Sequence, residues 1–472
     1  MADLAPTGHD AEPDAELEAV LAAIDADLDA SLERLFTFLR IPSISTDPAY
    51  RAACREAGQW LVDDLAGLGL AGGLNETPGH PIVTARSDFG APRRVMFYGH
   101  YDVQPVDPLE LWNTPPFEPT IVTAEDGTRR IVARGSADDK GQIMTFVEAC
   151  RAFLKVTGKL PVEVTLMLEG EEESGSLNLP PFVAANAAAL AADLALVCDT
   201  GMWDAATPAI TVSLRGLMHE EFVVHCADRD LHSGYYGGAA QNPLHVIAKI
   251  IADVHGPDGR VTIPGFYDEV RETPDEVKAQ WATLGLTPEN FLGPIGLSVP
   301  SGEQDRMLVE LVSSRPTFEV NGMWGGYIGA GSKTVIPAIA TAKISCRLVA
   351  DQDPVKVRDA VRAFIRARIP SDCSVEFLGG EGSRAVAVAH DSPDLKKAAA
   401  ALGAEWGTPP VTIGEGGSIP IVGHFKKVLG QDTLLVGFSL DDDRIHSPNE
   451  KYDLTSFHKG IRSWARILHA LA

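Results

Sequence analysis

The sequence predicts an α/β protein in which a smaller α+β domain is inserted into a discontinuous larger domain. The chain has 472 residues, which exceeds the size at which one hydrophobic core usually stops growing. Short apolar runs alternate with stretches of helical periodicity in its first and last parts, a pattern typical of helices layered on a sheet. The middle of the chain follows a different order of elements, so two domains are expected.

The outer parts of the chain form the larger predicted domain, residues 1–210 and 387–472. An amphipathic helix opens it, because apolar residues recur at helical spacing from Leu17 to Leu39 and Pro42 ends the pattern. Apolar runs predict strands at Arg94–Tyr98, Val162–Leu168, Leu194–Cys198 and Thr433–Phe438. Periodic stretches predict helices at Gln142–Val156, Leu395–Trp406 and Leu454–Leu471.

Residues 211–386 form the predicted insertion. Strands are expected at Glu220–Cys226, Thr317–Val320, Thr341–Val349 and Ser374–Leu378. Helices are expected at Pro243–Val254 and Pro354–Arg368, with Asn242 and Asp353 as their N-caps. A Pro/Gly-rich segment separates the first helix from the second strand. The resulting β-α-β-β-α-β order is that of a ferredoxin-like unit.

Charge and cysteine content restrict the class of protein. The chain carries 65 acidic and 40 basic residues, a formal charge of -25, which opposes binding to nucleic acid or to an anionic membrane. The absence of Lys and Arg before Arg34 argues against a secretory n-region or an Arg-rich transit peptide, and no apolar run reaches the ~18 residues of a membrane helix. The six cysteines have no motif spacing and are interpreted as reduced core thiols of a cytoplasmic protein.

One apolar strand pattern runs directly into three adjacent carboxylates, Glu171, Glu172 and Glu173. Like charges this close raise one another's pKa unless water or cations surround them. The triplet therefore has two interpretations, a solvated acidic turn or a group of carboxylates that faces cations.

Other chemistry-bearing residues also follow predicted strands. His100 and Asp102 lie on one face at the end of the first of them, where Asp102 could orient a metal-binding imidazole. A buried, hydrogen-bonded histidine is the alternative. Asp138 begins a helix as a metal ligand or as part of an N-capping pair. Asp199 and His446 each follow a strand, and either alone could be an ordinary turn residue.

The combination favours a metal site. His100, Asp138, one glutamate of the triplet, Asp199 and His446 all fall beside strand ends of one domain, where ligands of α/β sheets gather. Two imidazoles and three carboxylates suit a pair of Zn²⁺ or Mn²⁺ ions with one bridging carboxylate. Three carboxylates and one hydroxide also balance the charge of two divalent ions.

Four long motifs carry a resemblance to a known family. They are Gly99–Pro105, Arg134–Gly141, Leu168–Ser176 and His446–Lys451. In this order they resemble the co-catalytic metallopeptidase superfamily of aminoacylases, glutamate carboxypeptidases and succinyl-diaminopimelate desuccinylases, and the branch they look most like is the cytosolic carnosinase-like dipeptidases. The resemblance spans 41–453. It implies a zinc-peptidase-like α/β/α catalytic domain with an inserted lid and dimerisation domain.

The resemblance assigns roles to the site residues. It implies that His100, Asp138 and Asp199 hold one metal and that Asp138, Glu173 and His446 hold the other, with Zn²⁺ as the first expectation and Mn²⁺ as the second. Asp102 then orients His100. The family pattern Gly-x-Glu-Glu-Ser makes Glu172 the general base and leaves Glu171 without an assignment, as an exposed side chain.

The resemblance also implies residues around the substrate. The segment Asp230–Gly234 looks like the family segment whose histidine, here His232, stabilises the oxyanion in the neighbouring subunit's site, which implies a homodimer. Thr334 and Arg347 lie in segments that grip the substrate's carboxylate. Gly417 and Ser418 lie in a substrate loop that begins after Gly414, where relatives often have an Arg. The expected partners are a small peptide and a second copy of the chain.

The predicted function is metal-dependent hydrolysis of the amide bond of dipeptides, through a metal-bridging water activated by Glu172. Two alternatives stay open. One is a deacylase, desuccinylase or carboxypeptidase that acts on N-acyl amino acids with the same site. The other is a metal-binding scaffold without catalysis, against which the retained Glu172 argues, because a pure binder has no need of a base.

Overall fold

The computed structural model describes residues 14–380, 382–388, 392–415 and 419–472. These residues form two compact units. The first unit contains the described residues of 1–210, 389–411 and 424–472, and the second contains those of 211–388 and 412–423. Residues 412–423 were expected in the larger domain, but β16 (Val411–Glu415) pairs with β8 (Ala209–Leu214), the strand that leads into the second unit.

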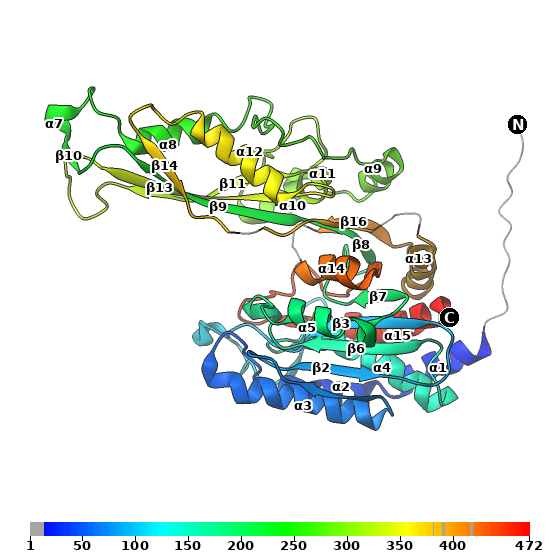
Figure 1. The fold of residues 1–472 in the computed structure, drawn as a ribbon. Helices are drawn as coiled ribbons and strands as arrows, with labels where there is room; N and C mark the ends of the chain where they lie inside the picture. Colours follow the sequence, from blue (N-terminus) through cyan, green and yellow to red (C-terminus); the bar gives the residue numbers. More distant parts are fainter. Residues whose placement is uncertain (1–13, 381, 389–391, 416–418) are drawn as a thin grey trace, which may run out of the picture. The chain divides into compact units, whose positions relative to one another are not determined.

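The first unit is a mixed α/β structure (Figure 1), as predicted. Its strands are β1 (Ala71–Asn75), β2 (Ile82–Arg86), β3 (Arg94–His100), β4 (Thr120–Thr123), β5 (Arg129–Val132), β6 (Glu163–Glu169), β7 (Leu194–Val197), β17 (Thr433–Leu435) and β18 (Lys451–Asp453). Its longer helices are α1 (Ala15–Ala26), α2 (Leu28–Leu39), α3 (Arg51–Gly67), α4 (Lys140–Thr157), α13 (Pro393–Trp406) and α15 (Leu454–Leu471). Its shorter helices are η1 (Pro48–Tyr50), η2 (Leu109–Leu111), η3 (Glu172–Ser174), α5 (Leu179–Ala185), α6 (Ala187–Leu190) and η5 (Phe425–Leu429).

Four parallel strands form the centre of the first unit's main sheet. β3 pairs in parallel with β6 on one side and with β7 on the other, and β17 pairs in parallel with β7. β2 joins β6 in antiparallel orientation, and β1 pairs with β2. The four parallel strands therefore end at one edge of the sheet, and the sequence predicted all four to within a few residues.

The opening helix differs from the prediction. The periodic stretch is two helices, because Asp27 leaves the helical conformation with φ -98° and ψ 5° and serves as the C-cap of α1 and the N-cap of α2. The apolar spacing carries through the break, since both helices pack against α4. A one-residue interruption of this kind leaves the hydrophobic pattern almost unchanged, which is why periodicity alone did not reveal it.

Aromatic rings bind the helices to the sheet in the first unit. Phe97 of β3 stacks on Phe146 of α4 with ring centroids 3.9 Å apart, and Trp464 of α15 meets both rings edge-on. All three side chains are completely buried, and each such burial contributes about 1.5–3 kcal/mol. Every helix in the described part of the chain is too short or too polar to cross a lipid bilayer.

The second unit has a ferredoxin-like arrangement. Its strands are β8, β9 (Gly216–His225), β10 (Leu231–His232), β11 (Thr317–Gly325), β12 (Val335–Ile336), β13 (Ile339–Leu348), β14 (Ser374–Phe377), β15 (Val386–Ala387) and β16. Its helices are α7 (Ser233–Tyr236), α8 (Pro243–Ala252), α9 (Asp275–Ala282), α10 (Pro288–Phe291), η4 (Gly293–Ile295), α11 (Leu308–Ser313), α12 (Pro354–Arg366) and α14 (Pro420–His424). Asn242 and Asp353 cap α8 and α12 through their side chains, as predicted.

The main sheet of the second unit has the strand order β11-β13-β9-β14. All its neighbouring strands are antiparallel. Apolar residues of β9 and β13 pack against α8 and α12 in one core that includes Phe222, Ile247, Ile344 and Val361. The strand order makes β11 and β14 the two edge strands of this sheet.

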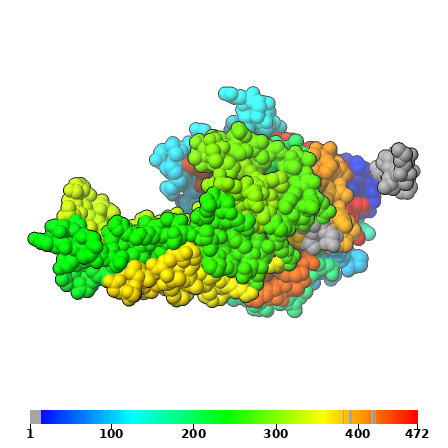
Figure 2. Space-filling view, turned by 90° about the horizontal axis from the view of Figure 1, so that it is seen from above, coloured from blue at the N-terminus to red at the C-terminus, as the bar shows by residue number. Residues whose placement is uncertain are grey.

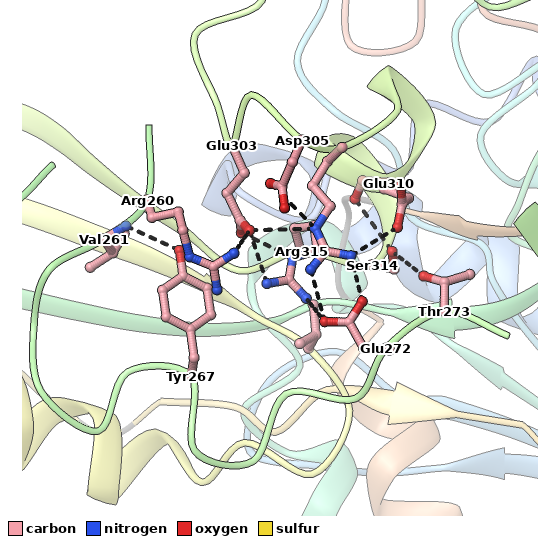
Figure 3. Close-up of polar contacts among 12 residues, drawn as sticks. Arg260, Val261, Tyr267, Glu272, Thr273, Glu303, Asp305, Glu310, Ser314 and Arg315 are labelled. Carbon is pink, nitrogen blue, oxygen red and sulfur yellow. Dashed lines mark hydrogen bonds and ion pairs between the residues drawn. The ribbon is translucent and has the colours of Figure 1, made fainter. Parts of the chain in front are cut away.

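A cluster of buried charges holds the Pro/Gly-rich segment of the second unit together (Figure 3). Glu303 accepts hydrogen bonds from the Arg315 guanidinium at 2.9 and 3.0 Å and from Arg260 at 2.9 Å. Glu303 and Arg315 are 4% and 3% exposed. Arg306 lies 3.6 Å from Glu303 and also pairs with Glu272. The Glu303 carboxylate thus pairs with the buried Arg315 guanidinium and also with Arg260, which is partly exposed.

Replacing Glu303 with Gln is expected to destabilise the second unit by about 3–5 kcal/mol, because it leaves the buried Arg315 guanidinium without its hydrogen-bonded carboxylate. Thermal unfolding followed by circular dichroism measures the effect. Asp305→Asn is the matched control, since the Asp305 carboxylate is 3.8 Å from Arg306 but 69% exposed, and exposed pairs contribute ~0–1 kcal/mol. Equal melting temperatures for the two variants would contradict a structural role of the cluster.

Candidate active site

The candidate residues of the first unit gather around the carboxyl ends of the parallel strands. His100 is the last residue of β3, and Asp138 lies two residues before α4. Glu172 and Glu173 follow β6 in η3, and Asp199 lies two residues after β7. His446 lies in the loop that precedes β18, with a left-handed backbone at φ 62°. The shared edge of the sheet brings these residues together, as the sequence predicted for strand ends.

Asp138 lies between the two imidazoles. Its Oδ1 is 2.9 Å from Nε2 of His100, and its Oδ2 is 2.9 Å from Nε2 of His446. Burial alone would raise the pKa of Asp138, but the hydrogen bonds to both histidines hold it well below its usual value. Hydrogen bonds of His446 to Asp138 and Glu173 raise the pKa of His446 to about 10. One carboxylate therefore contacts two nitrogen donors through its two separate oxygens.

The other two candidate ligands each approach one histidine. Glu173 Oε2 lies 3.2 Å from Nε2 of His446, and Asp199 Oδ1 lies 3.9 Å from Nε2 of His100. Burial raises the pKa of Asp199 well above its usual value. The cluster thus divides into a His100 side and a His446 side that share Asp138.

Asp102 connects this cluster to the glutamate triplet. Its backbone carbonyl lies 3.1 Å from Nδ1 of His100, whereas its carboxylate is 3.5 Å from that nitrogen. The carboxylate accepts the backbone N–H groups of Glu172 at 3.2 Å and Glu173 at 3.0 Å. Asp102 therefore orients the imidazole chiefly through its main chain, and its side chain positions the two glutamates.

Glu171 is not the exposed side chain that was expected. It is 8% exposed, its Oε1 accepts the backbone N–H of His80, and its Oε2 accepts Nδ2 of Asn178, both at 2.8 Å. A Cβ added at Gly79 would lie 1.4 Å from the same Oε1. Glu171 therefore connects the segment around His80 to the start of α5 through buried hydrogen bonds. No local sequence pattern indicates this long-range contact.

Replacing Glu171 with Gln is expected to lower the free energy of unfolding by about 1–3 kcal/mol, since one buried acceptor becomes a donor that faces another donor. Turnover at saturating substrate should change only a few-fold. Chemical denaturation and kcat measured on the same preparation separate the two effects. A large loss of kcat without a loss of stability would contradict the structural role.

Glu172 differs from both of its neighbours. Its carboxylate forms no hydrogen bond or ion pair within the described residues, whereas Glu173 accepts Nε2 of Gln104 at 2.7 Å in addition to its contact with His446. Burial raises the pKa of Glu172 to about 7. Of the three glutamates, Glu172 is therefore the one whose carboxylate is free to exchange a proton near neutral pH.

The donor set fits divalent metal ions. Donor atoms of His100, Asp138 and Glu173 all lie within 4.8 Å of one another. Two ligands of a tetrahedral zinc ion with bonds of ~2.0–2.1 Å are about 3.3 Å apart, close to the separations around Asp138. Imidazole and carboxylate donors together suit Zn²⁺ and also Mn²⁺. The sharing of Asp138 by two imidazoles is the arrangement that a bridging carboxylate requires.

Sequence reasoning missed the residues that support Asp138. Glu450 is completely buried and accepts the Arg134 guanidinium at 2.7 Å. Its two oxygens also accept the backbone N–H groups of Gly135 at 3.0 Å, Ala137 at 3.0 Å and Asp138 at 3.2 Å. Arg134 and Glu450 each lie in one of the four family motifs. Nothing else in the sequence indicates that they pair, because their contact spans more than 300 residues.

In the second unit, the structure brings His232 and Thr334 together. β10 pairs with β12 so that His232 lies opposite Val335, and the carbonyl of Thr334 accepts the N–H of Ser233 at 3.1 Å. Both residues are exposed. With α7 they form a projecting tip of this unit, coloured green at the left of Figures 1 and 2.

Arg347 of β13 lines a cavity of about 560 Å³ within the second unit. Arg215, which sequence reasoning missed, lines the same cavity, and burial and the charge of Arg347 lower its pKa to about 10. Its Nε is buried without a hydrogen-bond partner. Neither guanidinium is paired with a carboxylate in the part of the chain that the structure describes. Gly417 and Ser418 lie outside the described residues.

Comparison with known proteins identifies the family. Residues 96–470 match the model of peptidase family M20/M25/M40. The chain belongs to this family. It is 32% identical over 461 residues to the Cys-Gly metallodipeptidase DUG1 of Candida albicans, covering 93% of this chain and 94% of the relative.

Solved structures agree with this assignment. Human carnosine dipeptidase 1 is similar with a TM-score of 0.78 and 25% identity, covering 97% of this chain and 99% of that one. The M20 family metallo-carboxypeptidase Sso-CP2 from Sulfolobus solfataricus is similar with a TM-score of 0.79 and 31% identity, covering 94% and 99%. The chain is a metallopeptidase, and the prediction of the carnosinase-like dipeptidase branch is confirmed.

Proposed function

We propose that this M20 peptidase hydrolyses the amide bond of dipeptides at the cluster around Asp138, with two divalent metal ions, Zn²⁺ first and Mn²⁺ second. His100, Asp138 and Asp199 would hold one ion, and Asp138, Glu173 and His446 the other. The observation that carries the proposal is the single Asp138 carboxylate between two imidazoles, each at 2.9 Å. Near it lies the Glu172 carboxylate, which has no partner in the part of the chain that the structure describes.

The residues of the chain perform the proton transfers. Bound metal ions supply Lewis-acid polarisation of the scissile carbonyl and lower the pKa of water toward ~7. The Glu172 carboxylate accepts a proton from the attacking water and delivers it to the leaving amine. Asp102 holds the backbone of Glu172 and the ring of His100 in place. His232 of a second copy donates a hydrogen bond to the oxyanion, a contribution of about 10²–10³-fold in rate.

The carboxylate of the dipeptide is assigned to Arg347, with Thr334, Gly417 and Ser418 as further substrate contacts. Support for this comes from the guanidiniums of Arg347 and Arg215, which line one cavity and have no carboxylate partner among the described residues. A planar guanidinium binds a carboxylate through two parallel hydrogen bonds. A substrate with a free carboxylate is therefore expected to be preferred.

A substrate panel tests the proposal. The purified protein is loaded with Zn²⁺ or Mn²⁺ and incubated with Cys-Gly, β-Ala-His, further dipeptides, the same dipeptides amidated at the C-terminus, and N-acyl amino acids. Mass spectrometry should show cleavage of free dipeptides, loss of cleavage with chelator, and poor cleavage of the amides. Metal-dependent cleavage of N-acyl amino acids alone would overturn the dipeptidase assignment.

A carboxypeptidase is the second candidate, favoured by the similarity to Sso-CP2. Both activities require a free C-terminal carboxylate, so the length of the substrate distinguishes them. Longer peptides that lose one C-terminal residue at rates comparable to the dipeptides would favour the carboxypeptidase.

We also propose that the chain acts as a homodimer. β11 is the edge of its sheet, and its side chains Val320, Met323 and Trp324 are 41%, 49% and 44% exposed. An apolar edge strand offers unpaired backbone groups and apolar area to a second copy.

A cytoplasmic location stays a prediction, and it is supported by the free state of all six cysteines.

Mixing two inactive variants tests the dimer and His232 together. His232→Ala and Glu172→Gln are each expected to be nearly inactive alone. In a mixed dimer, one site combines an intact Glu172 with the intact His232 of the other copy, so about a quarter of all sites should regain activity after random exchange. Light scattering verifies the dimer. Recovery of no activity in verified mixed dimers would contradict action of His232 across subunits.

A further inference from the structure

Two cysteines of the second unit face each other across neighbouring strands. Cys226 follows the last residue of β9, and Cys373 precedes the first residue of β14. The antiparallel register places His225 opposite Ser374, so Cys226 and Cys373 are the next residues opposite each other. Their sulfur atoms are 3.1 Å apart, with the Cys373 thiol donating to Cys226. The two strands lie side by side in Figure 1.

This pair differs from the other four cysteines. Cys54, Cys150, Cys198 and Cys346 are at most 2% exposed, whereas Cys226 and Cys373 are both partly exposed. The interpretation of all six as core thiols is therefore wrong for two of them. Sequence spacing did not reveal the pair, because 147 residues separate its members. A small oxidant in solution reaches these two thiols before it reaches the other four.

We propose that Cys226 and Cys373 are a reversible oxidation site, which hydrogen peroxide or a low-molecular-weight disulfide converts to an intrachain disulfide. A disulfide needs sulfurs about 2.05 Å apart and Cα atoms about 4.4–6.8 Å apart. Residues directly opposite on antiparallel strands have Cα atoms about 4.5–5.5 Å apart. The sulfurs therefore need to approach by only about 1 Å, which side-chain rotation provides without movement of the strands.

Hydrogen peroxide oxidises the two thiols in two steps. One sulfur attacks hydrogen peroxide, so that an S–O bond forms and the O–O bond breaks, and the departing hydroxide takes the thiol proton as water. The second sulfur then attacks the resulting sulfenic acid, an S–S bond forms, and the S–O bond breaks with release of a second water. Two thiols and one peroxide give one disulfide and two waters. Dithiothreitol reverses the reaction by thiol–disulfide exchange.

The disulfide would join two segments of the second unit that are distant in sequence but adjacent in the sheet. Beyond Cys226 the chain leads toward β10, and just before that strand Asp230 accepts the N–H of Ala338 at 2.9 Å. Because the bond closes a loop of about 147 residues, it restricts the unfolded chain strongly, and its formation should raise the melting temperature of the second unit by roughly 10 °C. This consequence does not depend on the activity of the first unit.

Peroxide treatment of the full-length protein tests the proposal. The reduced protein, freed of reductant, is exposed to hydrogen peroxide and digested without reduction. We expect a linked Cys226–Cys373 peptide, an intact mass lower by two hydrogens, reversal by dithiothreitol, and a melting temperature raised by roughly 10 °C. The four buried cysteines are the internal control, since they should accept an alkylating agent only after denaturation.

Serine variants complete the test. Cys226→Ser and Cys373→Ser should each keep the melting temperature of the reduced protein and lose both the linked peptide and its peroxide response. Three results would overturn the proposal: separate sulfenic or sulfinic acids at the two positions, a disulfide between two chains, or a melting temperature unchanged by the intrachain bond.

Discussion

Replacing Glu172 with Gln is expected to lower kcat by about 10²–10⁴-fold, the usual contribution of a positioned acid or base. Metal content and melting temperature should stay at the values of the unchanged protein. The Glu172 carboxylate has no hydrogen-bond or ion-pair partner within the described residues, and burial raises its pKa to about 7. It can therefore exchange a proton near neutral pH. Glutamine keeps the shape of the side chain and removes its ability to accept a proton.

Three single variants make this test specific. Glu171→Gln, Glu172→Gln and Glu173→Gln change neighbouring carboxylates by the same chemistry, and we expect them to lower stability, turnover and metal content respectively. Metal analysis, denaturation and steady-state kinetics on all three give the pattern. If Glu172→Gln retained more than about a tenth of the activity, the base would lie elsewhere. If it lost metal as well, Glu172 would be a ligand.

The strand ends illustrate how much of the site the sequence could predict. Apolar runs located β3, β6 and β7, and the residues at or just after the ends of these strands include His100, Glu172 and Asp199. Parallel strands must end at one edge, so their proximity followed from the topology. The separate roles of Glu171, Glu172 and Glu173 could be predicted only from the family resemblance. The structure adds the contact of Glu171 with His80, which no local pattern indicates.

The remaining differences arise from long-range contacts. Glu171 is buried because the segment around His80, some 90 residues earlier, supplies its N–H donor. Glu450 supports Asp138 from more than 300 residues away. Cys226 and Cys373 meet only because β9 and β14 are neighbours in the sheet. In each case the type of the residue predicted the wrong environment or none at all. The burial of a side chain and its bonding partner depend on which helices and strands pack together.

Replacing Asp138 with Ala is expected to abolish activity and to weaken metal binding by more than about 100-fold, beyond the loss typical of a residue that only orients a ligand. Its two oxygens contact His100 and His446, so their loss removes a donor from both sides of the cluster. The imidazoles would then face Asp199 and Glu173 without the carboxylate that joins them. Metal analysis after dialysis should show less than one ion per chain.

Thermal unfolding gives a second measurement of the same loss. A ligand present at 100 times its dissociation constant stabilises the folded state by about 2.7 kcal/mol. Chelator should therefore lower the melting temperature of the unchanged protein and have little effect on Asp138→Ala. Asp442→Asn is the matched control, because its carboxylate pairs with Lys451 but is 61% exposed, and it should respond to chelator like the unchanged protein. An Asp138→Ala variant that still gained stability from added Zn²⁺ would show that the ions bind without the shared carboxylate.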